Sequence, residues 1–343
     1  DVHEDNAANI LAKNFNNTSI AIEKAFTGRS NILANESGLL VINEDNIRKF
    51  NEISNSITIA TLNNNSKVTK GEMIATIKII PFSVKEKSII ALKKINFKKS
   101  LYIHPFLEKK CALLLTHSNK ENIKLNSISE KRVKDRLQNL NCTLELIKTC
   151  KHDTNDITKS IKYFLNKEVD LVLILGSSAI VDINDKIPEA ILNTNGKIIR
   201  FGMPVDPGNL LLLGEIKKIP IIGLPGCARS PSLNGFDWVL ERVLSGNQIT
   251  NTDISNMGVG GLLKTLNKRD KKIDLGKTYK IANIILAAGQ SKRMLKDNKL
   301  LIKINKQYMI EKIVDTALNS SADSTVVVLG HQNNVMQEII QNK

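Results

Sequence analysis

Asp170-Leu-Val-Leu-Ile-Leu-Gly-Ser-Ser-Ala179 is the stretch that decides the fold, because a short apolar run ends abruptly in small residues. Consecutive aliphatic side chains bounded by turn residues are typical of a strand that is buried on both faces of a sheet. Gly176 and the two serines favour a loop rather than a helix at that point. The stretch therefore predicts a buried strand over residues 170–175 that opens into a small-residue loop.

Strands and helices alternate on both sides of this stretch. Apolar runs predict strands over residues 111–116, 144–148, 197–201 and 219–224, and helical spacing predicts helices over residues 129–140, 155–165 and 233–244. Alternation at this spacing implies a parallel-rich sheet with helices on both faces. We therefore expect an α/β domain over residues 109–248, with its ligand beyond the carboxyl ends of the strands.

Three loops of the expected domain follow strands and consist of small, polar and charged residues. Small residues let backbone N–H groups approach an anion, and carboxylates suit a metal or a polar ligand. Each loop alone is also typical of an ordinary turn. Together they predict a pocket for a polar, phosphorylated ligand, with Asp185 near its phosphate or a metal. The candidate residues are Gly176, Ser177, Ser178, Asp182, Asp185, Asp206, Pro207, Gly208, Asn209, Gly226, Arg229, Ser230 and Ser232.

The flanking segments predict a smaller unit and a connection. Residues 1–108 are expected to form a small α+β unit, with a helix over residues 6–15. Asp5 is expected to cap that helix, which favours capping over metal binding for the cluster at residues 3–5. A hairpin is expected to join residues 56–62 to residues 73–81. Residues 249–278 lose the alternation and are interpreted as a linker, in which Gly258-Val-Gly260-Gly261 forms a turn.

A new unit is expected over residues 279–343. A strand over residues 281–286 leads directly into Leu286-Ala-Ala-Gly-Gln-Ser-Lys-Arg-Met294, and Lys299 follows; a helix over residues 308–318 and a strand over residues 324–329 come next. The loop offers backbone donors for phosphates and cations for the charge on a leaving pyrophosphate. The P-loop spacing is absent. These residues predict a different kind of nucleoside triphosphate site.

The same loop resembles the opening signature of the sugar-nucleotide-type nucleotidyltransferases, in particular the branch that attaches a nucleotide to the molybdenum cofactor. The resemblance implies a Rossmann-like domain with nucleotide contacts from Leu286, Ala287, Ala288, Gly289 and Ser291, and catalytic phosphate contacts from Arg293 and Lys299. Leu295 stands where the family usually has Gly. Ala288, where the guanylyltransferases tend to have a second Gly, favours CTP over GTP.

The middle domain resembles the molybdopterin-binding domain shared by molybdopterin-adenylylating and molybdenum-inserting proteins. The matching residues are Gly176-Ser-Ser-Ala179, Asp185 with Pro188-Glu-Ala190, and Leu224-Pro-Gly-Cys-Ala-Arg-Ser230. Gly202-Met-Pro-Val-Asp-Pro-Gly-Asn209 and Asn234-Gly-Phe-Asp-Trp238 resemble a narrower family, in which this three-layer α/β domain precedes a molybdenum cofactor nucleotidyltransferase in one polypeptide.

The two resemblances together imply transfer of CMP from CTP to the terminal phosphate of molybdopterin, with release of pyrophosphate. The magnesium ligands are expected downstream of Lys343, and the first residue is not Met. We therefore expect a segment, truncated at both ends, that binds pterin without turnover. Two alternatives stay open: a non-catalytic carrier that delivers the cofactor to molybdoenzymes, and a nucleotidyltransferase that acts on another phosphate acceptor.

Composition bounds the remaining function classes. With 42% hydrophobic and 24% charged residues, the chain is typical of a globular protein. The net charge of +15 comes from 49 basic against 34 acidic residues, yet only nine of the basic residues are Arg and aromatics are 4%. This balance disfavours nucleic-acid binding, which relies on Arg and stacking aromatics. No signal peptide, membrane span or C-x-x-C pair is present in the sequence, so we expect a cytoplasmic protein with small-molecule substrates.

Overall fold

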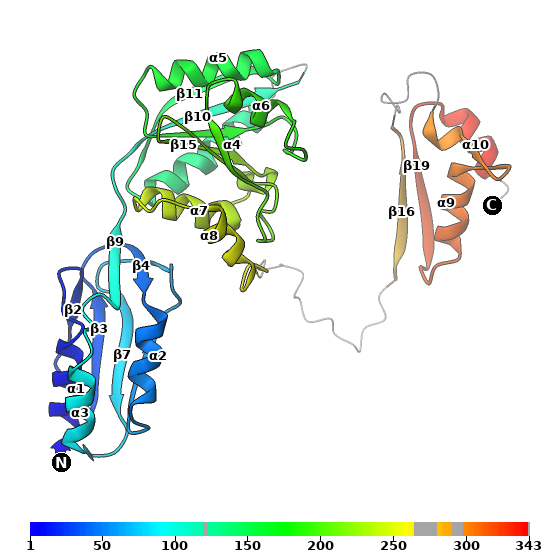
Figure 1. The fold of residues 1–343 in the computed structure, drawn as a ribbon. Coiled ribbons are helices and arrows are strands. Elements are labelled where there is room, and N and C mark those ends of the chain that lie inside the picture. Colours follow the sequence, from blue (N-terminus) through cyan, green and yellow to red (C-terminus); the bar gives the residue numbers. More distant parts are fainter. Residues whose placement is uncertain (119–122, 264–279, 290–297, 342–343) are drawn as a thin grey trace. The chain divides into compact units, whose positions relative to one another are not determined.

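The computed structural model describes residues 1–118, 123–263, 280–289 and 298–341. The chain divides into two compact units, Asp1–Thr265 and Leu266–Lys343. Unit 1 holds the small N-terminal part and the α/β domain, and unit 2 holds the C-terminal elements (Figure 1).

The N-terminal part of unit 1 is an α+β structure, as predicted. An antiparallel sheet in the order β2-β3-β7-β5 packs against helices, and a second small sheet has the order β6-β4-β9. Phe15, Phe50 and Phe97 pack against one another in its core. The elements are β1 (Val2–His3), α1 (Glu4–Lys13), β2 (Ile20–Ile22), β3 (Arg29–Ala34), β4 (Gly38–Ile42), α2 (Glu44–Glu52), β5 (Ile57–Thr61), β6 (Lys67–Val68), β7 (Met73–Ile79), β8 (Ser83–Val84), α3 (Glu86–Lys93) and β9 (Leu101–Pro105). The predicted pairing of residues 56–62 with 73–81 is confirmed, because β5 and β7 are antiparallel neighbours.

The predicted start of the first helix was wrong. Helix α1 begins at Glu4, and His3 is its N-cap because His3 Nδ1 accepts the Asp5 N–H at 3.3 Å. Glu4 and Asp5 both lie in the first turn, where their negative charges interact favourably with the helix dipole. The Asp5 carboxylate instead accepts the Gly28 N–H at 2.7 Å, so it fixes a neighbouring turn.

The middle domain is the predicted α/β structure with three layers. Its six-stranded sheet has the order β11-β10-β12-β15-β14-β13, and β11, β10, β12 and β15 are parallel. Helices α4 and α7 pack on one face and α5 and α6 on the other (Figure 1). All five residues of β12 are buried, as the opening stretch predicted. The elements are β10 (Lys110–His117), α4 (Ile123–Gln138), β11 (Thr143–Lys151), α5 (Thr154–Leu165), β12 (Leu171–Leu175), α6 (Lys186–Leu192), β13 (Lys197–Phe201), β14 (Leu212–Ile216), β15 (Ile219–Leu224), the 3-10 turn η1 (Gly226–Arg229) and α7 (Gly235–Leu244).

Strand β14 is an addition that the sequence analysis missed. It runs antiparallel to both of its neighbours, β13 and β15, so the sheet is mixed at this edge. Lys217 and Lys218 form the two-residue connection to β15, with φ of 49° and 70°. Such hairpin turns are usually recognised by Asn or Gly, and neither residue is present here.

The predicted linker is corrected over its first part. Residues 251–258 form helix α8 (Asn251–Ser255) and a 3-10 turn η2 (Asn256–Gly258). Arg200 Nη1 donates to Asn251 Oδ1 at 2.9 Å, and the Asp206 N–H donates to the Gly261 carbonyl at 2.8 Å. The glycine-rich segment therefore packs as a turn against the middle domain, because a Cβ on Gly261 would lie 2.4 Å from the Pro204 oxygen.

Unit 2 contains the predicted strands and helix. Strands β16 (Ala282–Ala287) and β19 (Ser324–Leu329) are parallel, and helices α9 (Met309–Leu318) and α10 (Asn333–Ile340) cover one of their faces. Ala287, Ile310, Val314 and Met336 form the core on that side. Within residues 298–308, the structure places the 3-10 turn η3 (Lys299–Leu301), β17 (Lys303–Ile304) and β18 (Gln307–Tyr308) ahead of α9.

Candidate functional site

The loop after β12 closes tightly on itself at the carboxyl edge of the middle sheet. A Cβ on Gly176 would lie 2.6 Å from the Ser178 carbonyl oxygen, so only glycine fits there. The Ser177 N–H donates to the Thr116 hydroxyl at 3.0 Å, which ties this loop to the end of β10. The side chains of Ser177 and Ser178 remain exposed at this edge of the sheet, which forms the rim of the candidate site.

His152 lies at the centre of this rim, and the sequence analysis missed it. Its Nδ1 is 2.7 Å from the Thr116 hydroxyl, while its Nε2 is 3.4 Å from Ser178 Oγ and 3.9 Å from Asp185 Oδ1. Burial lowers the pKa of the imidazole, and the nearby Asp185 carboxylate opposes this shift. His152 follows strand β11, so the rule that ligands bind beyond carboxyl strand ends could have found it.

Arg229 connects the loop after β15 to the loop after β12. Its Nη2 donates to the Gly176 carbonyl at 3.1 Å. Its Nε is buried, and the hydrogen bonds of the described residues give it no acceptor. Burial also lowers the pKa of this guanidinium. Two of the three predicted loops therefore meet at Arg229, whose unpaired donor suits an anionic ligand.

Arg136 on helix α4 fixes the loop that carries Arg229. Its Nη1 donates to the Ala228 carbonyl at 3.0 Å, and its Nη2 donates to the Ser230 carbonyl at 2.8 Å and the Ser232 carbonyl at 3.3 Å. Its Nε donates to the Asp237 carboxylate at 2.5 Å. Sequence reasoning missed Arg136 because a helical arginine is usually a surface residue.

The third predicted loop lies beside the start of α7. The Gly235 N–H donates to the Pro207 carbonyl at 2.8 Å, and a Cβ on Gly208 would lie 2.6 Å from the Gly235 nitrogen. Asp206 and Asn209 are exposed there, and Gly226 is exposed at the start of η1. The Asp182 carboxylate makes a local hydrogen bond in its own turn, where it accepts the Asn184 N–H at 2.7 Å.

Asp185 has a structural task at the rim. It is the N-cap of α6, and its Oδ1 accepts the Lys186 N–H at 2.7 Å. In the described ranges, no three His, Cys, Asp or Glu side chains meet to hold a metal ion.

The predicted nucleotide loop begins where β16 ends. Leu286 is exposed on the face of β16 opposite the helices, Ala287 is buried, and Ala288 and Gly289 are exposed after it. A Cβ on Gly289 would meet no atom within 4 Å. Lys299 is exposed at the start of η3. Ser291, Arg293 and Leu295 lie outside the described residues.

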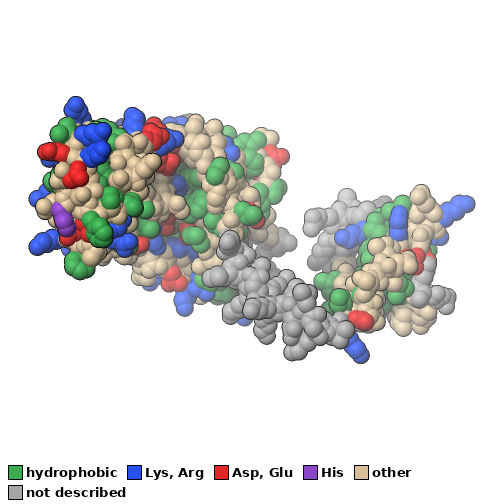
Figure 2. Space-filling model, turned by 90° about the horizontal axis from the view of Figure 1, so that it is seen from below, with side chains coloured by type: hydrophobic (Ala, Val, Ile, Leu, Met, Phe, Trp, Pro, Cys, Tyr) green, Lys and Arg blue, Asp and Glu red, His purple; other side chains and the backbone are tan. Residues whose placement is uncertain are grey.

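Positive charge is scattered over the face of unit 1 that Figure 2 draws. Figure 2 shows Lys and Arg side chains interspersed with acidic and uncharged ones on the face that is drawn. No continuous basic patch of the kind that follows a nucleic-acid backbone is visible on that face. None of the helices in the described ranges has the length and apolar character needed to cross a bilayer.

Comparison with known protein families gives a match in the C-terminal unit. Residues 283–341 match the family model of the MobA-like NTP transferase domain. No curated protein matches the chain in sequence. Three solved structures are similar: the molybdopterin biosynthesis MoeA protein of Pyrococcus horikosii (14% identity, TM-score 0.32, covering 71% of this chain and 79% of the other), molybdenum cofactor biosynthesis protein B (15%, 0.31, 41% and 96%) and the molybdopterin biosynthesis Mog protein of Mycobacterium ulcerans (13%, 0.28, 39% and 94%). The chain therefore carries a MobA-like NTP transferase domain over residues 283–341.

Proposed function

We propose that the chain acts in molybdenum cofactor biosynthesis, where its middle domain binds molybdopterin and its C-terminal domain binds the nucleotide that is transferred to it. The observation that carries the proposal is the MobA-like NTP transferase domain, because the predicted nucleotide loop lies inside it. The motifs at Gly176 and Arg229 support molybdopterin as the acceptor. Arg229, with its buried and unpaired Nε beside the Gly176 loop, suits the phosphate of that acceptor.

The proposed reaction is a nucleotidyl transfer. An oxygen of the terminal phosphate of molybdopterin attacks the α-phosphate of CTP, supplied as its magnesium complex, and pyrophosphate leaves. Arg293 and Lys299 neutralise the charge that develops on the pyrophosphate. Ala288 supports CTP over GTP as the donor. The proposed products are the CMP-linked cofactor and pyrophosphate.

The test is a calorimetric titration of the 343-residue chain with molybdopterin, and then with CTP and with GTP in the presence of Mg²⁺. Binding of molybdopterin together with tighter binding of CTP than GTP supports the proposal. Binding of molybdopterin alone indicates a carrier, and binding of nucleotide alone overturns the acceptor.

Two substitutions in the nucleotide loop sharpen this test. Arg293→Ala and Lys299→Ala should each weaken CTP binding by about tenfold or more, because each removes a charge-assisted phosphate contact. Lys312→Ala on α9 removes the same charge from an exposed helix position and serves as the matched control. Wild-type CTP affinity in both loop variants would contradict their proposed role.

A further inference from the structure

Glu241 on helix α7 is a buried carboxylate for which the described residues supply no side-chain hydrogen bond or ion pair. The relative exposure of Glu241 is 8%. Burial raises the pKa of Glu241 to about 7. Buried carboxylates are normally paired or hydrogen-bonded, because an unpaired buried charge is costly. Among the described residues of the middle domain, Thr116, Ser129 and Asn234 are equally buried but make side-chain hydrogen bonds, whereas Glu241 has none.

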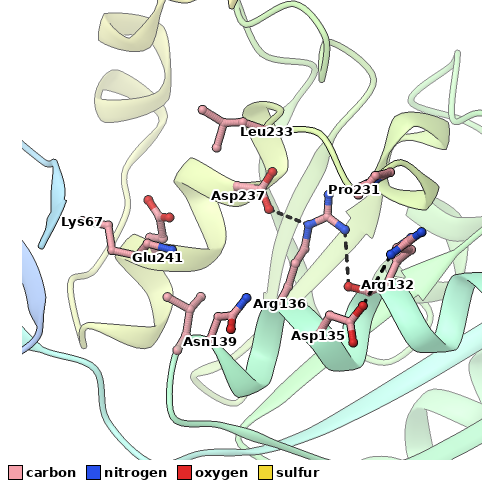
Figure 3. A pocket seen from close by; sticks show the side chains of 10 residues that line it. Lys67, Arg132, Asp135, Arg136, Asn139, Pro231, Leu233, Asp237 and Glu241 are labelled. Atoms are coloured by element: carbon pink, nitrogen blue, oxygen red, sulfur yellow. Dashed lines mark hydrogen bonds and ion pairs between the residues drawn. The ribbon is translucent and has the colours of Figure 1, made fainter. Parts of the chain in front are cut away.

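The Glu241 side chain lines a cavity of about 360 Å³ beside helices α4 and α7 (Figure 3). This volume lies within the range of about 300–1,000 Å³ that is typical of small-molecule sites. Arg136 and Asn139 from α4, Pro231 and Leu233 from the preceding loop, and Asp237 and Glu241 from α7 form much of the wall. The cavity thus combines apolar wall atoms with one carboxylate that needs donors.

Lys67 also lines this wall, and its positive charge favours the ionised form of Glu241. The charged groups that α4 and α7 contribute beside Glu241 have partners among the described residues. Each nitrogen of the Arg136 guanidinium donates: Nε to Asp237, Nη1 to the carbonyls of Arg132 and Ala228, and Nη2 to those of Ser230 and Ser232. Asp237 also accepts the Asn234 N–H at 2.8 Å, and Arg132 pairs with Asp135 at 3.5 Å. A ligand in the cavity would therefore meet Glu241 as its unsatisfied charged acceptor.

We propose that this cavity binds a flat, neutral heterocycle through two adjacent N–H donors, which Glu241 accepts. This donor pair is the 2-amino-4-oxopyrimidine edge that pterins and guanine share. A carboxylate accepts two parallel N–H donors in a bidentate manner, and Leu140, Pro231 and Leu233 provide apolar contacts for a ring. A neutral donor fits better than a cationic amine, because Arg132 and Lys67 also line the cavity.

The pterin form of this inference rests on the proposed function, since molybdopterin carries this ring edge, and it deepens that function by naming a subsite for the ring. The loop over residues 226–232 contacts both regions, the cavity on one side and the Gly176 loop on the other. Arg136 holds the loop residues Ser230 and Ser232 from the cavity side, whereas Arg229 from the same loop reaches the Gly176 rim. The ring subsite is therefore distinct from the anion-binding rim.

The test uses two pairs of probes that differ at the 2-amino group. The 343-residue chain is titrated by calorimetry with pterin and lumazine, and with guanosine and inosine. We expect the 2-amino member of at least one pair to bind about tenfold to a hundredfold more tightly, which is the effect of a hydrogen bond to a charged group. The pair that shows the larger ratio identifies the source of the ring. Equal affinities within both pairs would overturn the inference.

Substitutions then locate the effect. Glu241→Gln should abolish the preference for the 2-amino probe, because an amide offers one acceptor oxygen and opposes the second donor with its own N–H. Glu215→Gln is the matched control, since Glu215 lies on β14 and pairs with Lys197 at 3.0 Å. Retention of the preference in Glu241→Gln would exclude Glu241 as the acceptor. Circular dichroism checks that the variant folds, and the wild-type probe pairs decide the matter if it does not.

The outcome is separable from that of the proposed function. Molybdopterin binding that depends on Arg229 but shows no 2-amino preference would sink this inference and leave the proposed function standing. A 2-amino preference that depends on Glu241, without binding of molybdopterin or of a nucleoside triphosphate, would support this inference and contradict the proposed function.

Discussion

The Nε of Arg136 lies 2.5 Å from Oδ1 of Asp237, and both side chains are almost completely removed from solvent, with exposures of 11% and 13%. Residue 136 belongs to α4 and residue 237 to the first turn of α7, so this ion pair joins two helices that lie far apart in the sequence. Asp237 also completes the capping box of α7 with Asn234. One contact therefore fixes the start of a helix and the loop that precedes it.

Replacement of Arg136 should destabilise the middle domain strongly. Arg136→Ala leaves the Asp237 charge buried without its partner and releases the carbonyls of Ala228, Ser230 and Ser232. We expect a loss of about 3 kcal/mol in the free energy of unfolding, because breaking one side of a buried ion pair has this magnitude. Urea unfolding followed by the fluorescence of Trp238, which is the chain's one tryptophan, measures it.

The neighbouring Arg132 supplies the control for that measurement. It pairs with Asp135 at 3.5 Å, and the side chains are 33% and 46% exposed. Exposed pairs of this kind contribute about 1 kcal/mol or less, so Arg132→Ala should change the stability little. Similar losses in the two variants would show that the Arg136–Asp237 contact has no special weight.

The burial of Glu241 predicts a pH dependence of stability. Its pKa in the folded chain is about 7, against an ordinary value of 4.5, so the folded state binds this proton more tightly than the unfolded state. The middle domain should therefore lose stability as the pH rises from about 4.5 through 7, by about 3 kcal/mol in total. Glu241→Gln should remove this component and be more stable than the wild type at pH 8.

Unfolding of the wild type and of Glu241→Gln in urea at several pH values between 4.5 and 8.5 measures this difference. Groups that titrate in both proteins cancel in the comparison. His152 is one of these groups, since it is present in both proteins. Its lowered pKa makes the free energy of unfolding fall as the pH falls below about 6.5, which is opposite in sign to the effect of Glu241. A constant difference across this range would contradict the effect of burial on Glu241.

The elements that were predictable are those whose sequence signal is local. The buried run of β12, the turn at Gly176 and the strand that precedes Gly289 each follow from residue types over a few positions. Strand β14 escaped because Lys217 and Lys218 adopt positive φ without Gly or Asn to signal it. The segment at residues 251–263 escaped because its contacts with Arg200 and Asp206 are long-range.

The candidate site divides in the same way. Gly176, Ser178, Asp185 and Arg229 were predicted from loops, and the structure brings them to one rim. Thr116 was interpreted only as part of a strand, and its hydroxyl became visible as a link once β10 and β12 were paired. Glu241 gave no signal, because a glutamate in an amphipathic helix is normally exposed.

The hydroxyl of Thr116 should control the protonation of His152. It accepts the Ser177 N–H, and its proton can be donated to Nδ1, which stabilises the neutral imidazole. Thr116→Val should therefore raise the pKa of His152, and it should destabilise the domain by about 1 kcal/mol because the partly buried Ser177 N–H loses its acceptor. Thr116→Ser keeps the hydroxyl and serves as the control. Titration of the histidine Cε1 proton by NMR measures the shift, and an unchanged pKa in Thr116→Val would rule out this coupling.

Arg229 should contribute directly to binding of the phosphate of molybdopterin. Its Nη2 is committed to the Gly176 carbonyl at 3.1 Å, and its buried Nε is the donor that an anion would satisfy. Arg229→Ala should weaken molybdopterin binding by about tenfold to a hundredfold, since a charge-assisted bond is lost. Arg229→Lys should bind molybdopterin nearly as weakly as Arg229→Ala, because a single ammonium group cannot reproduce the two separate donors of the guanidinium.

Arg48→Ala on α2, where the side chain is 64% exposed, is the control and should leave the affinity for molybdopterin unchanged. Calorimetric titration with molybdopterin gives the three affinities; wild-type affinity in both Arg229 variants would move the phosphate away from the rim formed by Gly176 and Arg229.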